Sequence, residues 1–420
     1  MRRHHLLLLV LLALPLVVLP PFLSLGLQNT LVSMLVAALF AVSFNLLMGQ
    51  GGMLSFGHAA FFGIGAFATL HLMLAVEDGL GVPTPLLPLA GGLAGLALGL
   101  VAGYFATMRA GVYFSLVTLA LAELLHTLAP QWDGMFGGEA GLSSMRMPWG
   151  GLIFGSVLEV YYLSLAWVAL CLLLLWAYTR TPFGRLTLAL RDNEQRVRFM
   201  GYDTHKARLV VFAVSAMFSG VAGGLLAFSN EVANYTTFGM PVSAQVVLHT
   251  FIGGSTVFLG PVVGAAVLTL FAFFVSDLTR SWLLYQGVLF VLVMLYAPLG
   301  IGGIVELHLR HMRELRWRAL AGPYLEATAA GLLVAAGFVF VIESMAVLFS
   351  GDYAVLRRDA GGLPPFPFLG TAWQPLSPLT WLVPLLAMAA GGWLANRARH
   401  RIAPLWDEAR RAHTQGGETA

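Results

Sequence analysis

The chain has 420 residues, of which 58% are hydrophobic and only 10% are charged, and its formal net charge is +3. Soluble domains carry about 25% charged residues, so this composition excludes a soluble fold and indicates a protein that crosses a membrane several times. The small net charge gives no indication of nucleic-acid binding. The single cysteine, Cys171, excludes an intrachain disulfide, and its apolar surroundings indicate a packing residue.

Lys206, the only lysine, excludes a phosphate-binding P-loop in this chain. That loop requires Gly-x-x-x-x-Gly-Lys-Ser/Thr, whereas Lys206 is followed by Ala207 and lacks the glycine frame. The sequence also has no His-Glu-x-x-His, Cys-x-x-Cys or Gly-x-Ser-x-Gly pattern. We therefore expect a chain without catalytic residues, without a metal site and without a cofactor of its own.

The first residues resemble a signal peptide, because Arg2 and Arg3 precede the apolar run 6–18. No small-residue cleavage site is evident, and Pro20, Pro21 and a further apolar run follow. We expect an uncleaved first helix.

Apolar runs of about 20 residues predict helices that cross the hydrocarbon layer. We place them near 6–26, 28–48, 58–76, 86–107, 111–128, 157–178, 208–229, 242–260, 261–277, 282–300, 324–349 and 378–396. The pair between 242 and 277 is short and glycine-broken, which indicates half-helices or a re-entrant pair. The predicted fold is all-α and polytopic, with about ten core membrane helices and about two more towards the C-terminus.

The basic residues predict the orientation of these helices. If the N-terminus is cytoplasmic, only Arg146, Arg280, Arg357 and Arg358 of the 23 basic residues lie in outer loops. Because basic residues collect on the cytoplasmic side, both termini are predicted to be cytoplasmic.

Two further patterns concern packing. Gly91, Gly95, Gly99 and Gly103 recur every four residues, which predicts a close contact with another helix. Residues 306–321 alternate arginines with apolar residues such as Leu307 and Leu315, which predicts an interfacial helix on the cytoplasmic surface.

The first break in the apolar pattern is Gly49–His58. Gly51 and Gly52 disfavour helix, while Gln50, Ser55 and His58 bring polar groups to membrane depth. Non-helical backbone survives there only inside protein or beside a water-filled cavity, so one interpretation is a solute path. The other is a tight cytoplasmic turn with a structural histidine.

The second break is Ile252–Pro261, followed by the small residues Gly264, Ala265 and Ala266. It has the same character as the first break, since glycines and hydroxyl side chains lead into a helix. Its candidate path residues are Gly253, Gly254, Ser255 and Thr256. The similarity of the two breaks suggests an internal repeat, although only the pattern recurs.

The charged segment, residues 181–208, is the longest charged stretch between two predicted helices. Pro182 can open a helix and Gly201 can close it. The segment contains Arg185, Arg191, Asp192, Asn193, Glu194, Arg196 and Arg198. Two interpretations are open: a solvated loop whose arginines fix the topology, and a docking helix for a cytoplasmic protein, whose surface suits mixed charges better than anionic lipid does.

Glu123 and His126 lie three residues apart within an apolar run, on one face of the predicted helix. An intramembrane carboxylate is costly and is a functional candidate by default. A neutral or paired structural residue is the alternative.

At these same positions the chain resembles LivM-type permeases, the membrane subunits of branched-chain amino-acid ABC importers. The resemblance rests on collinear matches over about 28–305. They are 45–49, 54–66, 118–120 with Glu123, 137–142, 182–185, 191–194, Gly201, 253–256, 260–261 and 264–265.

The resemblance implies an inner-membrane permease domain over residues 1–305, which works with a second homologous permease, two cytoplasmic ATPases and a periplasmic solute-binding protein. ATP would be used by the ATPases. Residues 181–208 would be the coupling segment, with Pro182, Gly184, Arg185, Arg191, Asp192, Asn193, Glu194 and Gly201 as its matched positions. The two breaks would line the solute path.

The chain departs from the family pattern in two places. Arg196, Val197 and Phe199 stand where small alanines are usual, which suggests a docking surface adapted to one ATPase. Residues 322–420 add two helices and a basic tail, whose role the sequence leaves open.

Two alternatives to an amino-acid importer remain at this point. One is the same kind of importer carrying urea, short amides or aromatic acids. The other is a proton-coupled secondary carrier, with Glu123 and His126 as its relay.

Overall fold

The computed structural model describes residues 14–312, 314–368 and 371–418. The predicted first helix near 6–26 extends outside these residues, and Arg2 and Arg3 lie outside them. The chain forms two compact units. The first consists of residues up to Phe274 together with Gln286–Ile304, and the second of Val275–Tyr285 together with the chain from Val305 onward.

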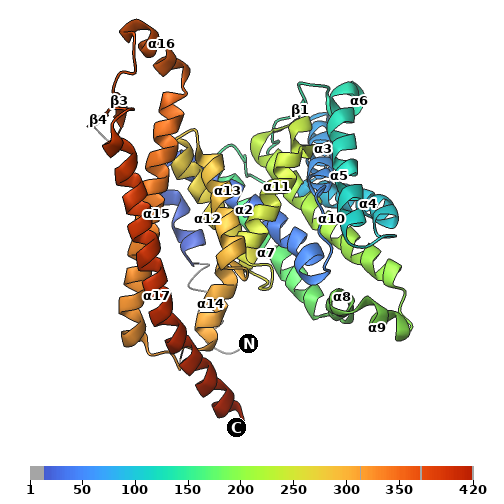
Figure 1. The fold of residues 1–420 in the computed structure, drawn as a ribbon. Helices are drawn as coiled ribbons and strands as arrows, with labels where there is room; N and C mark the ends of the chain where they lie inside the picture. The colour runs from blue at the N-terminus through green and yellow to red at the C-terminus, as the bar shows by residue number, and fades with distance from the viewer. Residues whose placement is uncertain (1–13, 313, 369–370, 419–420) are drawn as a thin grey trace. The chain divides into compact units, whose positions relative to one another are not determined.

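The structure is built almost entirely of helices, as the composition predicts (Figure 1). The helices up to the start of the C-terminal region are α2 (Leu25–Asn45), α3 (Ala59–Glu77), α4 (Pro88–Ala106), α5 (Val112–Leu128), α6 (Asp133–Phe136), α7 (Val157–Arg180), α8 (Pro182–Asp192), α9 (Glu194–Phe199), α10 (Thr204–Asn230), α11 (Met240–Gly253), α12 (Gly260–Ser276), α13 (Trp282–Tyr296) and α14 (Gly300–Arg310). The strands β1 (Leu142–Ser143) and β2 (Val232–Ala233) pair antiparallel, with Leu142 opposite Ala233.

Within the described residues, eight helices are long and apolar enough to cross a membrane, or nine if the bent pair α13 and α14 counts as one span. With the shorter apolar helices α11 and α12, they account for every predicted segment except the one near 6–26. The prediction of a polytopic all-α membrane protein is confirmed.

Helix α2 lies at the centre of the first unit, where it packs against α7, α10 and α11. Most of its side chains are buried, including Leu39 and Phe44, which are fully inaccessible. A helix that is apolar on all sides is typical of a membrane span, and its burial places this span inside the bundle.

The predicted glycine contact joins α4 to α10. A Cβ atom added to Gly95 would lie 2.4 Å from the carbonyl oxygen of Ala216, and one added to Gly91 would lie 2.5 Å from that of Gly220. Only glycine permits backbones to approach this closely.

Helices α11 and α12 are the expected short pair. At 1.5 Å per residue, their 14 and 17 residues span roughly 21 and 26 Å, less than the ~30 Å of hydrocarbon. Their glycines meet directly, because a Cβ on Gly253 would lie 2.1 Å from the carbonyl oxygen of Gly260. Gly254, between them, has a φ of +104°, which other residues rarely adopt.

The second unit contains α15 (Trp317–Leu348), α16 (Gly351–Ala360) and α17 (Pro378–Glu418), with β3 (Phe366–Phe368) paired antiparallel to β4 (Thr371–Trp373). Helices α15 and α17 run side by side (Figure 1). They pack closely, because a Cβ on Gly337 would lie 2.6 Å from the carbonyl oxygen of Pro384.

Glu343 of α15 is hydrogen-bonded within this second unit. Its carboxylate accepts hydrogen bonds from Thr279 at 2.6 Å and Tyr285 at 2.5 Å.

The segment 306–321 differs from the single interfacial helix that the sequence suggests. Helix α14 ends at Arg310 and α15 begins at Trp317. Leu315 and Leu320 are buried in a cluster with Trp406 of α17, and Trp406 donates a hydrogen bond to Tyr324 at 3.0 Å. These apolar residues therefore pack within the protein at a corner between two helices.

Candidate functional site

The first break begins with a π-helical turn. Helix α2 continues through this turn at Leu46–Gln50, after which the chain is non-helical until α3 begins at Ala59. Such turns are rare and often lie at functional sites. The predicted interruption of the helix is confirmed.

Helix α5 holds the non-helical part of the first break. Ser115 donates a hydrogen bond to the carbonyl oxygen of Leu54 at 2.5 Å, and the Phe56 amide donates to the Thr118 hydroxyl at 3.2 Å. A Cβ on Gly57 would lie 1.6 Å from the Thr118 carbonyl oxygen. Position 57 therefore requires glycine, because the backbone of α5 lies directly against it.

The two breaks touch through their backbones. A Cβ on Gly49 would lie 2.4 Å from the carbonyl oxygen of Ser255. Glycine is needed here for close approach, so the two breaks lie in direct backbone contact.

The charged segment, residues 181–208, also contacts the first break. The Arg191 guanidinium of α8 donates a hydrogen bond to the carbonyl oxygen of Gly49. The Arg191 side chain also packs on Gly52, where a Cβ would lie 2.9 Å from its Cγ. The structure thus brings together three motifs that are far apart in the sequence, and Gly49 is where they meet.

Several buried polar atoms around the first break lack hydrogen bonds. Within the described residues, no partner contacts Asn45 Oδ1, Gln50 Oε1 or Ser55 Oγ. A buried polar atom without a partner costs about 1–3 kcal/mol. Such atoms mark a region whose polar groups are left ready for water, a solute or a rearranged backbone.

His58 lies in an aromatic environment. Its ring is inaccessible to solvent and contacts the rings of Phe40, Phe44 and Phe61, with centroid separations of 5.8, 5.4 and 5.6 Å. Its Nε2 lies 3.1 Å from the Ser215 hydroxyl, which donates its own hydrogen to the Ser43 carbonyl oxygen at 2.6 Å. Nε2 therefore carries the proton. This geometry favours the structural interpretation of His58.

The charged segment forms two helices, where Pro182 and Gly201 suggested one. The Thr181 hydroxyl caps α8 by accepting from the Gly184 amide at 3.2 Å. Asn193 ends that helix and caps α9 by accepting from the Arg196 amide at 2.9 Å. Asparagine competes with the backbone for hydrogen bonds and so favours helix ends over helix interiors. Gly201, at a φ of +86°, makes the turn into α10.

Glu194 fastens α9 to the start of α10. Its carboxylate accepts from Arg208 at 2.5 Å, Arg198 at 3.3 Å and Thr204 at 3.2 Å. Partial burial alone would raise the pKa of this carboxyl, but the hydrogen bond and charge of Arg208, with smaller contributions from Thr204 and Arg198, outweigh it and hold the pKa below its ordinary value.

The outer face of α8 and α9 is both charged and apolar. Leu190, Val197 and Ala207 form a small buried cluster beneath it. The exposed side chains include those of Phe183, Arg185, Leu188, Asp192, Arg196, Phe199, Met200 and Tyr202. Phe199 is 90% exposed, and an exposed apolar patch rimmed by polar groups is typical of a protein-binding surface.

Glu123 and His126 lie on α5, where Glu123 is exposed. The His126 ring contacts Tyr235, with 5.4 Å between the centroids. No hydrogen bond or ion pair links Glu123 to His126 in the part of the chain that the structure describes.

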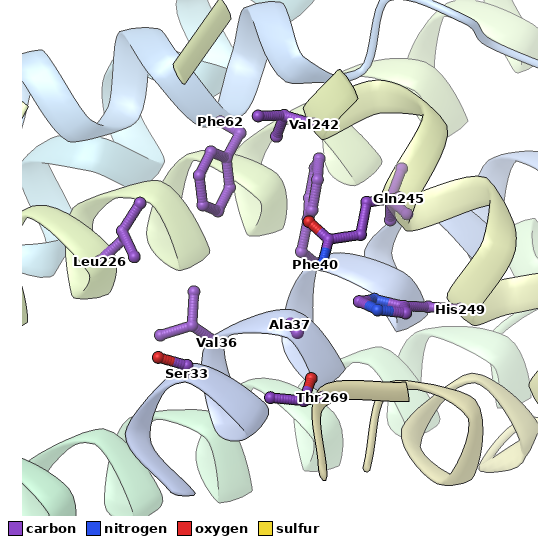
Figure 2. Close-up of a pocket in the computed structure, with 11 residues that line it drawn as sticks. Ser33, Val36, Ala37, Phe40, Phe62, Leu226, Val242, Gln245, His249 and Thr269 are labelled. Atoms are coloured by element: carbon purple, nitrogen blue, oxygen red, sulfur yellow. The ribbon is translucent and has the colours of Figure 1, made fainter. Parts of the chain in front are cut away.

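A cavity of about 200 Å³ lies among α2, α3, α10, α11 and α12 (Figure 2). His249 and Gln245 of α11, Ser33 of α2 and Thr269 of α12 are its polar lining residues. The sequence analysis missed this cavity. The available signal was His249, a histidine within an apolar half-helix that ends at the second break.

Comparison with known proteins shows what the chain resembles. Residues 26–298 match the family described as branched-chain amino acid transport system / permease component. The chain is 28% identical to the high-affinity branched-chain amino acid transport system permease protein LivM of Escherichia coli K12 over 63% of this chain and 67% of that protein.

Two further relatives broaden the comparison. The autoinducer 2 import system permease protein LsrC of Salmonella typhi is 30% identical over 42% of this chain and 52% of its own length. The probable branched-chain amino acid transport permease protein LivH of Methanocaldococcus jannaschii is 24% identical over 60% of this chain and 83% of its own length. No solved structure matches the chain.

The family match extends from α2 to α13 and includes both breaks and the charged segment. This chain therefore belongs to the permease components of branched-chain amino acid transport systems.

Proposed function

We propose that this ABC-importer permease subunit carries branched-chain or similarly apolar amino acids across the bacterial inner membrane. It would work with a second homologous permease, two cytoplasmic ATPases and a periplasmic solute-binding protein. The chain itself would have no catalytic role, since the ATPases would hydrolyse ATP. The names of the relatives LivM and LivH support this solute class.

The observation that carries the proposal is the contact of Arg191 with Gly49. Helices α8 and α9 present an exposed mixed surface that suits an ATPase partner, and Arg191 on α8 holds the first break by its backbone. Gly49 in turn packs on Ser255 of the second break. A displacement of α8 by the ATPases would therefore reach the first break through the Arg191 side chain and the second break through the backbone contact of Gly49 with Ser255.

The two breaks would be the segments of the solute path that change conformation during transport. Gln50 and Ser55 keep buried polar atoms without partners at the first break, and the glycines and hydroxyls of 253–256 form the turn of the second. Exposed backbone dipoles at helix breaks can hold a polar solute in transporters. The positive-inside pattern supports placing α8 and α9 in the cytoplasm.

A related importer with another solute is the second candidate, because LsrC, named as a permease for autoinducer 2 import, also matches this chain. The proton-coupled carrier gains no support, since the structure shows no contact between Glu123 and His126 among the residues it describes.

Reconstitution tests the proposal. The permease pair, the ATPases and the binding protein are placed in proteoliposomes, and uptake of radiolabelled L-leucine is measured with internal ATP. We expect uptake only with ATP, ATPases and binding protein together. Uptake by this chain alone under a proton gradient would overturn the importer mechanism, and ATP-dependent uptake of urea or an aromatic acid in place of leucine would overturn the proposed solute.

A further inference from the structure

The cavity beside α11 combines an apolar wall with a polar edge. Figure 2 shows the Gln245 amide and the His249 ring directed into it from α11, with Phe62 and Leu226 across from them. Phe40 and Phe62 form a packed pair in the wall, with ring centroids 4.6 Å apart. An apolar cavity with a few convergent polar groups is the usual form of a small-molecule site.

His249 is the unusual residue of this cavity. Its side chain is buried, with the residue only 2% exposed, yet neither ring nitrogen has a hydrogen-bond partner among the described residues. A neutral imidazole offers one donor and one acceptor, and burying both without partners is unfavourable. The ring lines the cavity, so the missing partners would have to come from what the cavity holds.

The edge of the cavity is polar and open. Ser33 and Gln245 are exposed, although they lie on the membrane-spanning helix α2 and the apolar half-helix α11. Polar side chains at membrane depth normally face a protein interior or a water-filled cavity, not lipid. The cavity therefore opens towards water or another protein subunit.

The size of the cavity limits its occupant. About 200 Å³ exceeds the ~150 Å³ of an apolar cavity known to admit benzene. A small aliphatic group fits the wall formed by Val36, Phe40, Phe62 and Val242. A polar group on the occupant that offers both a hydrogen-bond donor and an acceptor would satisfy both ring nitrogens of His249.

We propose that this cavity is where the transported solute contacts the chain, and that the solute is a zwitterion with a small aliphatic side chain. The side chain would lie against Phe40 and Phe62, the ammonium or carboxylate would bind His249, and Gln245 would contribute at the edge. This inference rests on the proposed function and adds the site and its selectivity. His58 then acts as a positioning residue, because its ring stacks on Phe40.

The first test is selectivity in the complete reconstituted importer. Ala37→Leu adds bulk to the cavity wall, and Ala97→Leu adds the same bulk to an exposed position of α4 as a control. We expect Ala37→Leu to reduce ATP-dependent uptake of L-leucine about tenfold and that of L-alanine by less than about threefold. The control should change neither. Equal loss of both solutes, or no loss of leucine uptake, would overturn the inference while leaving the proposed function intact.

The second test concerns His249. His249→Phe keeps a ring but removes both hydrogen-bonding atoms, and His249→Gln restores a donor and an acceptor. We expect leucine uptake to fall about tenfold in the first variant and to recover to within about threefold in the second. Gel filtration and basal ATPase activity identify variants that fail to fold. Unchanged uptake in correctly folded His249→Phe would contradict the assignment.

A binding measurement separates this inference from transport. Thr269→Cys is introduced together with Cys171→Ala, and its modification by a cationic methanethiosulfonate is timed in the assembled permease. L-leucine should slow the reaction about threefold or more, whereas D-glucose should not. Protection without any uptake in the wild-type importer would contradict the proposed function alone. Absence of protection, with normal uptake, would contradict the site alone.

Discussion

Arg191 of α8 donates a hydrogen bond to the carbonyl oxygen of Gly49, at the π-helical turn that extends α2. The two residues are 142 positions apart in the sequence. A guanidinium is always charged and presents several donors in a fixed plane, so it can hold a carbonyl oxygen that the π-helical turn leaves available. This contact links α8 directly to the break that follows α2.

Replacing Arg191 by alanine should uncouple ATP hydrolysis from uptake. Because the substitution removes the only side-chain donor to Gly49 O among the described contacts, we expect leucine uptake in proteoliposomes to fall about tenfold, with the ATPases still bound. Arg191→Lys should be intermediate, because lysine keeps the charge but lacks the planar donors.

Arg109→Ala is the matched control, since Arg109 is an exposed arginine in another short loop. It should leave uptake unchanged. If Arg191→Ala transports as well as this control, the contact with Gly49 has no role in coupling.

The double reversal Arg191→Glu with Glu194→Arg should be as inactive as the worse of its two single variants. The two residues have different partners, because Arg191 contacts Gly49 and Glu194 contacts Arg208. Exchanging the charges therefore restores neither contact. Uptake of the double variant is compared with that of each single variant, and recovery above both would mean that the two side chains act as one pair.

Gly95→Ala should destabilise the bundle, because the added Cβ would lie 2.4 Å from the Ala216 carbonyl oxygen. Overpacking of this kind costs about 1–3 kcal/mol. The thermal midpoint of the detergent-solubilised protein reports the change. Gly287→Ala is the control, because nothing lies within 4 Å of its added Cβ on α13. A midpoint for Gly95→Ala equal to that of the control would refute the close packing of α4 on α10.

Glu194→Gln should weaken the attachment of α9 to α10 near neutral pH. The folded pKa of Glu194 lies below its unfolded value of about 4.3. Its stabilisation is therefore fully present above that value and is lost as the pH falls through the folded pKa. We expect the thermal midpoint to differ between wild type and variant at pH 7, and the difference to shrink as the pH falls below about 4.3 and through the folded pKa. The neighbouring variant Asp192→Asn serves as the control, and a difference that persists unchanged at acidic pH would contradict the ion pair.

The sequence predicted most of the fold because a membrane imposes a simple rule. Each crossing needs a long apolar helix, so α3, α7 and α10 lie within a few residues of their predicted positions. The glycine repeat from Gly91 to Gly103 was equally informative, since only small residues permit such an approach. The break at Asn193 was less visible, because the stretch between Pro182 and Gly201 holds no proline and no glycine beyond Gly184 and is otherwise compatible with one helix.

The site was only partly predictable. Both breaks stood out, since glycines and polar residues interrupt apolar runs. Their contact with each other and with Arg191 depends on how α2, α8 and α12 pack, which no local pattern encodes. The cavity beside His249 was missed for the same reason, because five helices separated in the sequence build it.

The glycine contacts between α11 and α12 limit how this part of the protein can move. Gly253, Gly260 and Gly264 place backbone directly on backbone, so at these positions no side chain lies between the two helices to change rotamer and absorb a shift. We therefore expect a motion of the turn at Ser255 to shift the end of α11 with it and to reposition His249, one turn before Gly253.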